Sequence, residues 1–479
     1  MSSPFRDDAL VWFRRDLRVA DHATLATAVA EARRVHCVFV FDRDILDALD
    51  DRHDRRLNFI HDALAALDAE LAARGGLSSG ARTLTVLHGH APTVIPQLAR
   101  RLACSAVYAG RDVEPQALAR DAAVSRALEA DGRHLVLIKD QVVFEADEVL
   151  TAAGRPYTVY TPYRRAWEKR RDAIPAAIVE RRPALRPGVL QPAVEELAPL
   201  DAYGFAPVAL ADIGVVASEA GALAALAAFQ PRLPDYAAAR DFPAQAATSM
   251  LSPHLRFGTL SVRQAVRAAL AANSPSWLGE LIWRDFFFAI LAAFPQSATQ
   301  NFKRAYDRVV WRDPAGEAAA DFAAWKSGTT GYPLVDAGIR ELLATGRMHN
   351  RVRMVVASFL CKHLGIHWQH GERFFAAHLL DYDLAANAGN WQWAASTGCD
   401  AQPWFRIFNP VTQSQRFDAD GAYLRRWVPE LAELPAPAIH APWKLPAAQH
   451  PADYPPPVVD HATGRQDALA RFAVLRGAT

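Results

Sequence analysis

Acids, amides and indoles are concentrated in one short stretch of this sequence, residues 378–416. Asp381 and Asp383 stand two positions apart, and Asn387 follows before a Trp-Gln-Trp segment at 391–393. A packed helix normally carries one apolar stripe at a spacing of about 3.6 residues and few Asn or Gly residues. The alternation of polar, small and large aromatic residues instead favours a wall around a large, flat, polar ligand. A helix-loop-helix with a buried polar network explains the stretch equally well.

Three further segments combine groups that could bind a ligand. Hydroxyls and backbone N–H groups at a predicted helix start in 248–252 suit phosphate, although an ordinary N-cap explains them as well. In 277–288, Glu280 and Trp283 share a helix face, which could stack on a base and hydrogen-bond its edge, or could simply bury one indole. The basic helix start in 346–363 fits either phosphate contact or a solvated face.

Together these segments supply phosphate donors, acids, amides, indoles and arginines. That combination fits a large cofactor and a nucleic-acid ligand better than the active site of a small-molecule hydrolase. The sequence contains neither an HExxH motif nor a P-loop. No GxGxxG follows the first predicted strand, where the basic loop WFRRDLR (12–18) stands instead, so a nicotinamide site of the usual kind is not indicated.

The elements that must position these groups divide the chain into three parts. In residues 1–140, short apolar runs alternate with helical stretches rich in Ala and Leu. This pattern predicts an α/β domain with a doubly wound, five-stranded parallel sheet of Rossmann-like type. Residues 141–220 are rich in Pro and Ala and predict a linker, in which 158–167 starts a helix. Residues 221–479 carry mainly helical patterns and predict an all-α domain.

The individual elements follow from the same patterns. The expected strands are 9–13, 35–41, 83–89, 105–110 and 134–140. The expected helices of the last part are 221–229, 236–240, 261–271, 276–293, 318–326, 333–345, 349–363, 370–379 and 421–431. The Pro-rich tail that follows is expected to lie across a surface.

Size and composition narrow the class of protein. The chain has 479 residues, a formal net charge of +1 and 4 cysteines without CxxC spacing. This cysteine usage predicts a reduced, cytoplasmic protein without a zinc site or other metal. No window has the long apolar run of a membrane span, and the N-terminus lacks the pattern of a secretory signal. Because the net charge is close to zero, any binding of nucleic acid would depend on local clusters of basic residues.

Five motifs, in the correct order, resemble the signatures of the photolyase/cryptochrome family. They are TSMLSPHLRFG (248–258), WLGELIWRDFF (277–287), TGYPLVDAGIRELLATGRMHNRVRM (330–354), DYDLAANAGNWQWAASTG (381–398) and WFRIFNPVTQSQRFD (404–418). The resemblance covers essentially the whole chain. Within the family, MHNRVRM (348–354) is most similar to the class I cyclobutane pyrimidine dimer photolyases.

The resemblance implies FAD bound in a U-shape by the helical domain, which would be both FAD- and DNA-binding. The implied cofactor contacts are Tyr236, Thr248, Ser249, Met250, Leu251, Ser252, Asn350, Arg353, Asp381, Tyr382, Asp383 and Asn387. The hydroxyls and N–H groups of 248–252 would hold the diphosphate. Asp381, paired with Arg353, would meet the isoalloxazine and ribitol, and Asn387 would face flavin N5.

The family's activity is implied in the same way. Blue light would excite FADH⁻, which passes an electron to a flipped-out dimer in UV-damaged DNA; the cyclobutane ring then splits and the electron returns. The implied catalytic residues are Glu280, Trp283, Asn350, Met354, Asn387 and Trp393. The implied DNA contacts are Arg240, Glu280, Trp283, Arg284, Phe287, Asn350, Arg351 and Gln413. Trp391, Trp368 and Trp311 match the family's electron-transfer chain.

Some properties stay open at this point. The positions that hold an Asn-Glu pair in folate-binding members read Gln116-Ala117, so a folate antenna, a deazaflavin, another flavin and no antenna are all alternatives. The competing functions are a cryptochrome-type blue-light photoreceptor, a (6-4) photolyase and a DNA-binding flavoprotein without repair activity. We expect a monomer that binds neither metal nor membrane.

Overall fold

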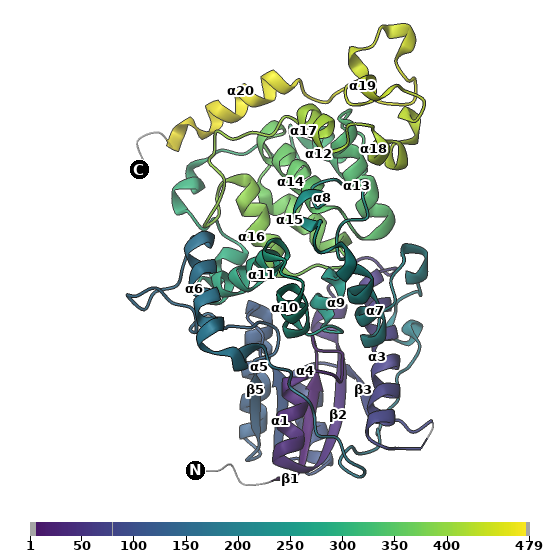
Figure 1. Cartoon of the computed structure of the whole chain (residues 1–479), viewed down its shortest axis with the longest axis vertical. Helices are drawn as coiled ribbons and strands as arrows, with labels where there is room; N and C mark the ends of the chain where they lie inside the picture. Colours follow the sequence, from purple (N-terminus) through teal and green to yellow (C-terminus); the bar gives the residue numbers. More distant parts are fainter. Residues whose placement is uncertain (1–5, 79, 476–479) are drawn as a thin grey trace. The chain divides into compact units, whose positions relative to one another are not determined.

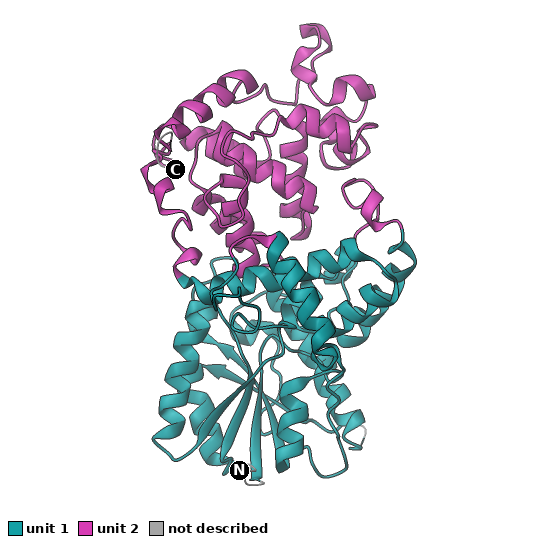
Figure 2. Ribbon diagram, turned by 60° about the vertical axis from the view of Figure 1, so that its left-hand side comes forward, with its two compact units in different colours: residues 1–157, 161–234, 249–295 teal, residues 158–160, 235–248, 296–479 magenta. Residues whose placement is uncertain are grey.

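The computed structural model describes residues 6–78 and 80–475. The chain forms two compact units (Figure 2). Unit 1 comprises residues 1–157, 161–234 and 249–295, and unit 2 comprises residues 158–160, 235–248 and 296–479. These borders differ from those expected at 140 and 220, because most of the connector and the helical stretch 249–295 group with the sheet.

Unit 1 is built on a five-stranded parallel sheet, as the alternating pattern predicted (Figure 1). Its strands lie in the order β3-β2-β1-β4-β5. They are β1 (Arg6–Phe13), β2 (Ala32–Asp42), β3 (Leu84–Gly89), β4 (Ala106–Gly110) and β5 (His134–Ile138). The helices between them are α1 (Ala23–Glu31), α2 (Arg43–Leu46), α3 (Arg55–Arg74), α4 (Ala91–Arg101) and α5 (Pro115–Glu129). The central strands are apolar on both faces because helices flank both faces.

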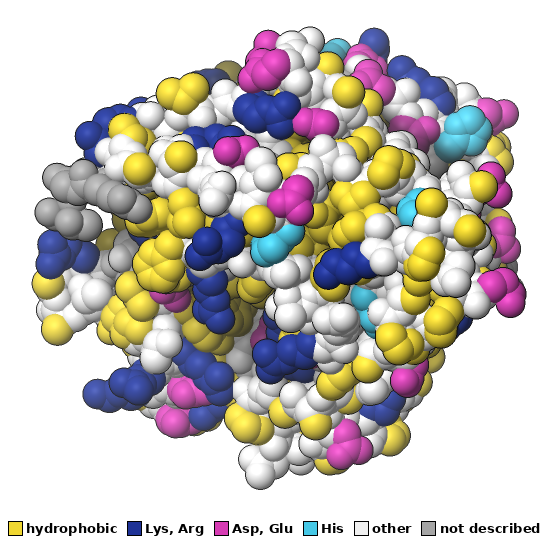
Figure 3. Space-filling model, turned by 90° about the horizontal axis from the view of Figure 1, so that it is seen from above, with side chains coloured by type: hydrophobic (Ala, Val, Ile, Leu, Met, Phe, Trp, Pro, Cys, Tyr) yellow, Lys and Arg dark blue, Asp and Glu magenta, His cyan; other side chains and the backbone are white. Residues whose placement is uncertain are grey.

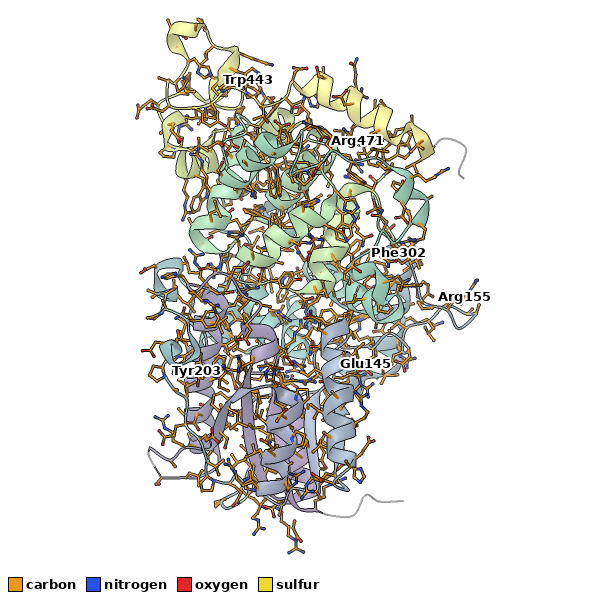
Figure 4. All side chains as sticks on the ribbon, turned by 180° about the vertical axis from the view of Figure 1, so that it is seen from behind. Glu145, Arg155, Tyr203, Phe302, Trp443 and Arg471 are labelled. Carbon is orange, nitrogen blue, oxygen red and sulfur yellow. The ribbon has the colours of Figure 1, made fainter. Side chains whose placement is uncertain are left out.

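The connector and the first helices of the second half pack onto this sheet domain. They include α6 (Tyr160–Ala173), α7 (Glu219–Phe229), α9 (Ser252–Phe257), α10 (Val262–Ala271) and α11 (Pro275–Ala293). Tyr203, labelled in Figure 4, stacks on Phe41 of β2 with ring centroids 4.2 Å apart. Gly258, at φ +70°, lies so close to the loop after β1 that an added Cβ would stand 1.9 Å from the Arg15 carbonyl oxygen. Such contacts explain why the predicted linker is part of unit 1.

Helix α11 is held within unit 1 by one buried carboxylate. Asp285 Oδ2 accepts hydrogen bonds from Trp167 Nε1 on α6 at 3.0 Å and from the backbone N–H of Val143 at 3.1 Å and of Phe144 at 3.4 Å. Burial raises the pKa of Asp285 to about 6. Because α11 carries Glu280 and Trp283, this anchor fixes the position of two predicted site residues.

Unit 2 is helical, as predicted (Figure 1). It contains α8 (Tyr236–Ala239), α12 (Ala319–Ser327), α13 (Pro333–Thr345), α14 (Asn350–Ser358), α15 (Trp368–His378), α16 (Leu384–Ala395), α17 (Pro410–Phe417), α18 (Ala422–Trp427), α19 (Ala436–Ile439) and α20 (His461–Phe472). The expected helix 349–363 is α14 followed by a π-helical turn, Phe359–His363. None of the helices in the described ranges is both long and apolar enough to cross a membrane.

Helix α16 forms the centre of the 378–416 stretch, and its Asn387 and Gln392 side chains are both buried and hydrogen-bonded to other segments. Asp383 caps its N-terminus by accepting from the N–H groups of Ala385 at 3.1 Å and Ala386 at 3.3 Å. It ends at Ser396, whose φ is 73°. Gly371 on α15 lets the two helices approach, because a Cβ there would lie 2.1 Å from the Trp391 ring.

Candidate functional site

Helices α14, α15 and α16 and the turn before α16 surround a pocket in unit 2. Its empty volume is about 580 Å³, open solvent included. Nine residues predicted for the site line it: Asn350, Arg353, Met354, Asp381, Tyr382, Asp383, Asn387, Trp391 and Trp393. The remaining lining residues are Ala357, Phe375, Leu379, Ala386, Asn390 and Ala394. An apolar wall with a few convergent polar groups is typical of a small-molecule or cofactor site.

An ion pair forms one side of this pocket. Arg353 Nη2 lies 3.1 and 3.0 Å from the two carboxylate oxygens of Asp381, which is the pairing that the sequence suggested. Arg353 Nε also donates to the Met348 carbonyl oxygen at 2.8 Å, so the guanidinium is fixed at its base. The pair therefore presents an oriented cation and an oriented acceptor to a polar ring.

A second polar group in the pocket is the Asn387 amide, which is 9 % exposed. Its Nδ2 donates to the backbone oxygen of Glu372 at 3.1 Å and to Glu372 Oε1 at 3.0 Å. The Tyr382 hydroxyl donates to the same Oε1 at 3.2 Å. Burial raises the pKa of the Glu372 carboxyl above its usual range, although the two donors oppose that effect.

Indoles stand behind the polar groups. Trp391 is buried, with its ring centroid 4.9 Å from Phe375 and 6.2 Å from Trp325. Its Nε1 is buried and has no hydrogen-bond partner among the described residues. A buried donor without an acceptor in the protein fits a pocket that a polar ligand completes. These observations, with the ion pair and the amide, are consistent with a flavin-sized ring system.

Trp368 and Trp311 lie elsewhere in unit 2. Trp368 is fully buried, and its Nε1 donates to Asn301 Oδ1 at 2.8 Å. Trp311 is partly exposed. The His367 ring lies between them, 5.5 Å from the Trp368 ring and 5.3 Å from the Trp311 ring. A continuous aromatic path therefore joins a buried indole to a partly exposed one.

The predicted DNA contacts of unit 2 show local partners. Arg351 Nη2 pairs with Asp241 at 2.8 Å, and its guanidinium lies 4.4 Å from the Phe417 ring centroid. Arg240 lies over the ring of Tyr236 at 5.3 Å. Asn350, the first residue of α14, is exposed. Gln413 on α17 is partly buried.

The other predicted residues belong to unit 1. On α11, Trp283 stacks on Phe287 with ring centroids 5.4 Å apart, and Glu280 is partly buried. Arg284 donates to the Gln141 carbonyl oxygen and lies 4.4 Å from the Phe288 ring centroid, so it also anchors α11. In the 248–252 segment, Ser249 Oγ accepts from the Leu251 N–H at 3.4 Å. Met250 adopts a φ of 56° there, which gives the segment a tight bend.

Comparison with known proteins agrees with this architecture. Residues 9–184 match the family described as DNA photolyase, and residues 277–474 match the FAD binding domain of DNA photolyase. The deoxyribodipyrimidine photo-lyase of Halobacterium salinarum is 39% identical over 98% of this chain and 99% of its own. A class III photolyase from Agrobacterium tumefaciens superposes with a TM-score of 0.85 at 35% identity, covering 99% of both chains. An archaeal photolyase from Sulfolobus tokodaii, described with two FAD molecules, gives a TM-score of 0.79 at 30% identity over 97% of this chain and 99% of its own.

A sheet domain joined to a helical, FAD-binding unit defines this chain as a flavoprotein enzyme of the photo-lyase type. It belongs to the photolyase/cryptochrome family.

Several residues that shape the site carried no signal in the sequence. Glu372 lies 15 positions from Asn387, which it contacts, so no helical or strand spacing relates them. Asp241 stands in an irregular segment before the 248–252 loop, and nothing in its neighbours marks it as the partner of Arg351. Trp325 reads as an ordinary buried aromatic of α12, although it contacts Trp391.

Proposed function

We propose that this chain repairs cyclobutane pyrimidine dimers in UV-damaged DNA by light-driven electron transfer, as a class I photolyase. The observation that carries the proposal is the pocket of unit 2, which joins the Arg353–Asp381 pair, the Asn387 amide and the buried Trp391 indole. The curated relative's name, deoxyribodipyrimidine photo-lyase, supports the same reaction. The class I assignment rests on the residues of 348–354.

FAD in its reduced form, FADH⁻, supplies upon blue-light excitation the electron that opens the cyclobutane ring. The chain's contribution is to hold and orient the groups around it. In this proposal, Arg353 and Asp381 bind the polar edge of the isoalloxazine and ribitol, and Asn387 faces N5. The contacts proposed along the rest of the cofactor are Tyr236, Thr248, Ser249, Met250, Leu251, Ser252, Asn350, Tyr382 and Asp383.

A second set of residues acts on the damaged DNA. Glu280 and Asn350 hydrogen-bond the pyrimidine edges and stabilise the charge that develops on them. Trp283 and Trp393 pack against the dimer, with Met354 beside it. Contacts to the strand, which position the lesion without reading its sequence, come from Arg240, Arg284, Phe287, Arg351 and Gln413.

Three indoles serve a separate purpose, the reduction of oxidised cofactor. We propose electron transfer along Trp391, Trp368 and Trp311 toward the pocket. The aromatic contacts of His367 with both Trp368 and Trp311 support the outer half of this path. The partial exposure of Trp311 suits a terminus that an external reductant must reach.

The decisive experiment is dimer removal from a UV-irradiated, thymine-containing oligonucleotide by the purified, reduced protein under blue light, with a dark control. Loss of dimers in light only supports the proposal. Flavin retention without loss of dimers contradicts it, and the same assay on (6-4) lesions then tests that substrate. If neither lesion is removed, the photoreceptor function gains support.

The second chromophore is tested by counting flavins. The Sulfolobus tokodaii relative, described with two FAD molecules, makes a flavin antenna the first candidate here. Heat release and chromatography of the bound chromophores would give two flavins per chain in that case. One flavin with a folate or a deazaflavin, or one flavin alone, would contradict it.

We further propose that the protein is a cytoplasmic monomer that needs no metal.

A further inference from the structure

The indole N–H of Trp368 begins a chain of two hydrogen bonds. Trp368 is fully buried at the start of α15, and its Nε1 donates to Asn301 Oδ1 at 2.8 Å. Asn301 is 6 % exposed, and its Nδ2 donates to Asp307 Oδ1 at 2.8 Å. An indole N–H can only donate and a carboxylate can only accept, so the orientation of the amide between them is fixed.

The segment that carries Asn301 is held by the helix that lines the pocket. Gln392 of α16 donates from Nε2 to the Ser297 carbonyl oxygen at 2.7 Å and to the Gln300 carbonyl oxygen at 3.2 Å. Its Oε1 accepts from the backbone N–H of Phe302, which is labelled in Figure 4, at 2.8 Å. Because these bonds lie on both sides of Asn301 in the chain, the position of the amide is fixed as well as its orientation.

Loss of one electron from an indole changes the strength of the hydrogen bond that it donates. The N–H of an oxidised indole carries part of the positive charge, and a charged donor makes a bond about twice as strong as a neutral one. In a buried site the low dielectric strengthens this bond, and a carboxylate at the far end of the amide adds to it. The acceptor therefore stabilises oxidised Trp368 more than it stabilises the neutral side chain.

The negative charge of Asp307 is only partly balanced by its neighbour. Asp307 Oδ2 pairs with Arg304 Nη2 at 2.9 Å, and the side chain of Arg304 is 64 % exposed, so water screens the cation. Asp307 also acts on the His367 ring, where burial lowers the pKa to about 4 and the charge of Asp307 opposes that shift. Since the His367 ring contacts Trp368, the influence of Asp307 reaches the aromatic side chains around this indole.

We propose that Asn301, oriented by Asp307, is a positioning residue that lowers the oxidation potential of Trp368. This inference rests on the proposed function, in which Trp391 gives one electron to light-excited, oxidised FAD. Trp368 then gives one electron to oxidised Trp391, which becomes neutral, while Trp368 becomes a radical cation whose N–H proton stays bonded to Asn301. The acceptor makes this transfer more favourable. Because the electron returns by way of Trp391, the lifetime of oxidised Trp368 lengthens in proportion.

The lifetime of oxidised Trp368 measures this effect when the radical cannot move outward. Each substitution is therefore made in Trp311→Phe, and the indole radical is followed by transient absorption after a flash on the protein with oxidised FAD. Asn301→Leu removes the acceptor. Asp307→Asn keeps an oxygen that can accept from Asn301 Nδ2 and removes the charge. Arg304→Gln removes the opposing cation and keeps the carboxylate.

For Asn301→Leu we expect the radical lifetime to shorten by about tenfold, as for the loss of one charge-assisted hydrogen bond. A tenfold change corresponds to roughly 59 mV in a one-electron potential. For Asp307→Asn we expect a shortening of about threefold, the size of a partly screened charge interaction. Arg304→Gln should give a lifetime at least as long as that of the Trp311→Phe parent, because the carboxylate is then less compensated. Asp453→Asn, the same chemical change at an exposed acid before α20, is the matched control and should change nothing.

Equal lifetimes in Asp307→Asn and its parent would overturn the proposal, and this variant decides the question even if Asn301→Leu does not fold. A shorter lifetime in Arg304→Gln would also overturn it, because opposite changes of charge would then act alike, as in a purely structural disturbance.

The outcome is independent of repair. Equal lifetimes in a protein that repairs dimers refute the role of Asn301 alone. The expected changes in a protein without repair activity refute the proposed repair and leave the role of Asn301 standing. Absence of any indole radical in the parent would refute the proposed electron path and this inference together.

Discussion

Glu280 is partly buried on α11, one turn before Trp283, where the proposed function has it hydrogen-bond the damaged pyrimidine. We expect Glu280→Ala to lower the efficiency of dimer splitting by about tenfold, since one charge-assisted hydrogen bond is lost. The flavin content should not change, because its proposed contacts lie on other segments. Repair assays and flavin absorbance of the same preparations test this. Loss of flavin on purification would remove Glu280 from the proposed role.

Trp311 is the most exposed of the three indoles proposed to carry electrons. We expect Trp311→Phe to slow the photoreduction of oxidised flavin by at least about tenfold, because phenylalanine is much harder to oxidise than indole. Repair by enzyme reduced beforehand should be unaffected. Trp443→Phe is a suitable control, since Trp443, labelled in Figure 4, is not one of the three proposed indoles and packs on Tyr332 with ring centroids 5.0 Å apart. Equal photoreduction by both variants would exclude Trp311.

The sequence predicted the residues of the pocket better than their partners. Nine of its lining residues lie in motifs that could be found from residue type and family resemblance. Glu372 and Asp241 could not be found, because each acts through a contact between segments distant in sequence. For Arg284 the sequence predicted a contact with DNA but not the role that the structure shows. Its guanidinium contacts Gln141 and Phe288 within unit 1.

At the scale of elements, a buried lysine holds the C-terminal end of α16. Lys362 Nζ donates to the Ala395 carbonyl oxygen at 3.2 Å, to Ser396 Oγ at 2.8 Å and to the Trp404 carbonyl oxygen at 3.4 Å. It also lies 3.9 Å from the Phe472 ring centroid, and burial lowers its pKa to about 7. A cation at a helix C-terminus is favourable, while its removal from water is costly.

That pKa predicts how stability changes with pH. Between pH 7 and the ordinary lysine pKa, the unfolded chain holds a proton that the folded chain has released, so the free energy of unfolding rises with pH. We expect this rise to be on the order of 3 kcal/mol and to be absent in Lys362→Met. Urea unfolding at pH 7 and pH 9.5 measures it for both proteins. The same rise in the variant would show that Lys362 is not its source.

Asp285, the buried carboxylate that anchors α11, gives a free energy of unfolding that falls as the pH rises. The pKa of Asp285 in the folded protein is about 6, which is above its value in the unfolded chain. Its contribution to the free energy of unfolding is therefore complete in acid and is lost as the pH rises through 6. Asp285→Asn keeps an oxygen for the donors from Val143, Phe144 and Trp167 and cannot ionise. We expect the variant to be more stable than the unsubstituted protein at pH 7.5 by about 3 kcal/mol, with the difference nearly vanishing around pH 4. A constant difference across this range would contradict the assignment.

The ends of the helices and strands agree with the hydrophobic pattern where burial of apolar residues determines the element. The five strands and most helices of the second half lie where periodicity placed them. The hydrophobic pattern did not predict α20 (His461–Phe472), because a Pro-rich segment precedes this helix and only its Gly464, Ala468 and Phe472 are buried. The turn Phe359–His363 is π-helical, a local change in winding that does not alter the apolar spacing enough to be detected.

At the scale of the whole molecule, a net charge of +1 means that DNA affinity must come from local cations. Figure 3 shows Lys and Arg side chains interspersed with acidic and hydrophobic ones on the face it displays. We therefore expect a modest salt dependence for binding of a damaged duplex. In Arg351→Gln, the slope of log K against log salt concentration should be smaller by about one. Lys326→Gln, an exposed change on α12, is the control. An unchanged slope would place Arg351 away from the phosphates.

The capped, closely packed helix α16 has a consequence for how this chain can vary. Asn387 and Trp391 are one turn apart on it, roughly 6 Å along the axis and on one face. Inserting or deleting a single residue between them would turn the indole by about 100° relative to the amide. Such a turn would take the indole out of its place against Gly371, where a Cβ would stand 2.1 Å from the ring, so we expect a change of length here to disrupt the pocket. The pocket therefore depends on the spacing of residues along this helix as well as on their identity.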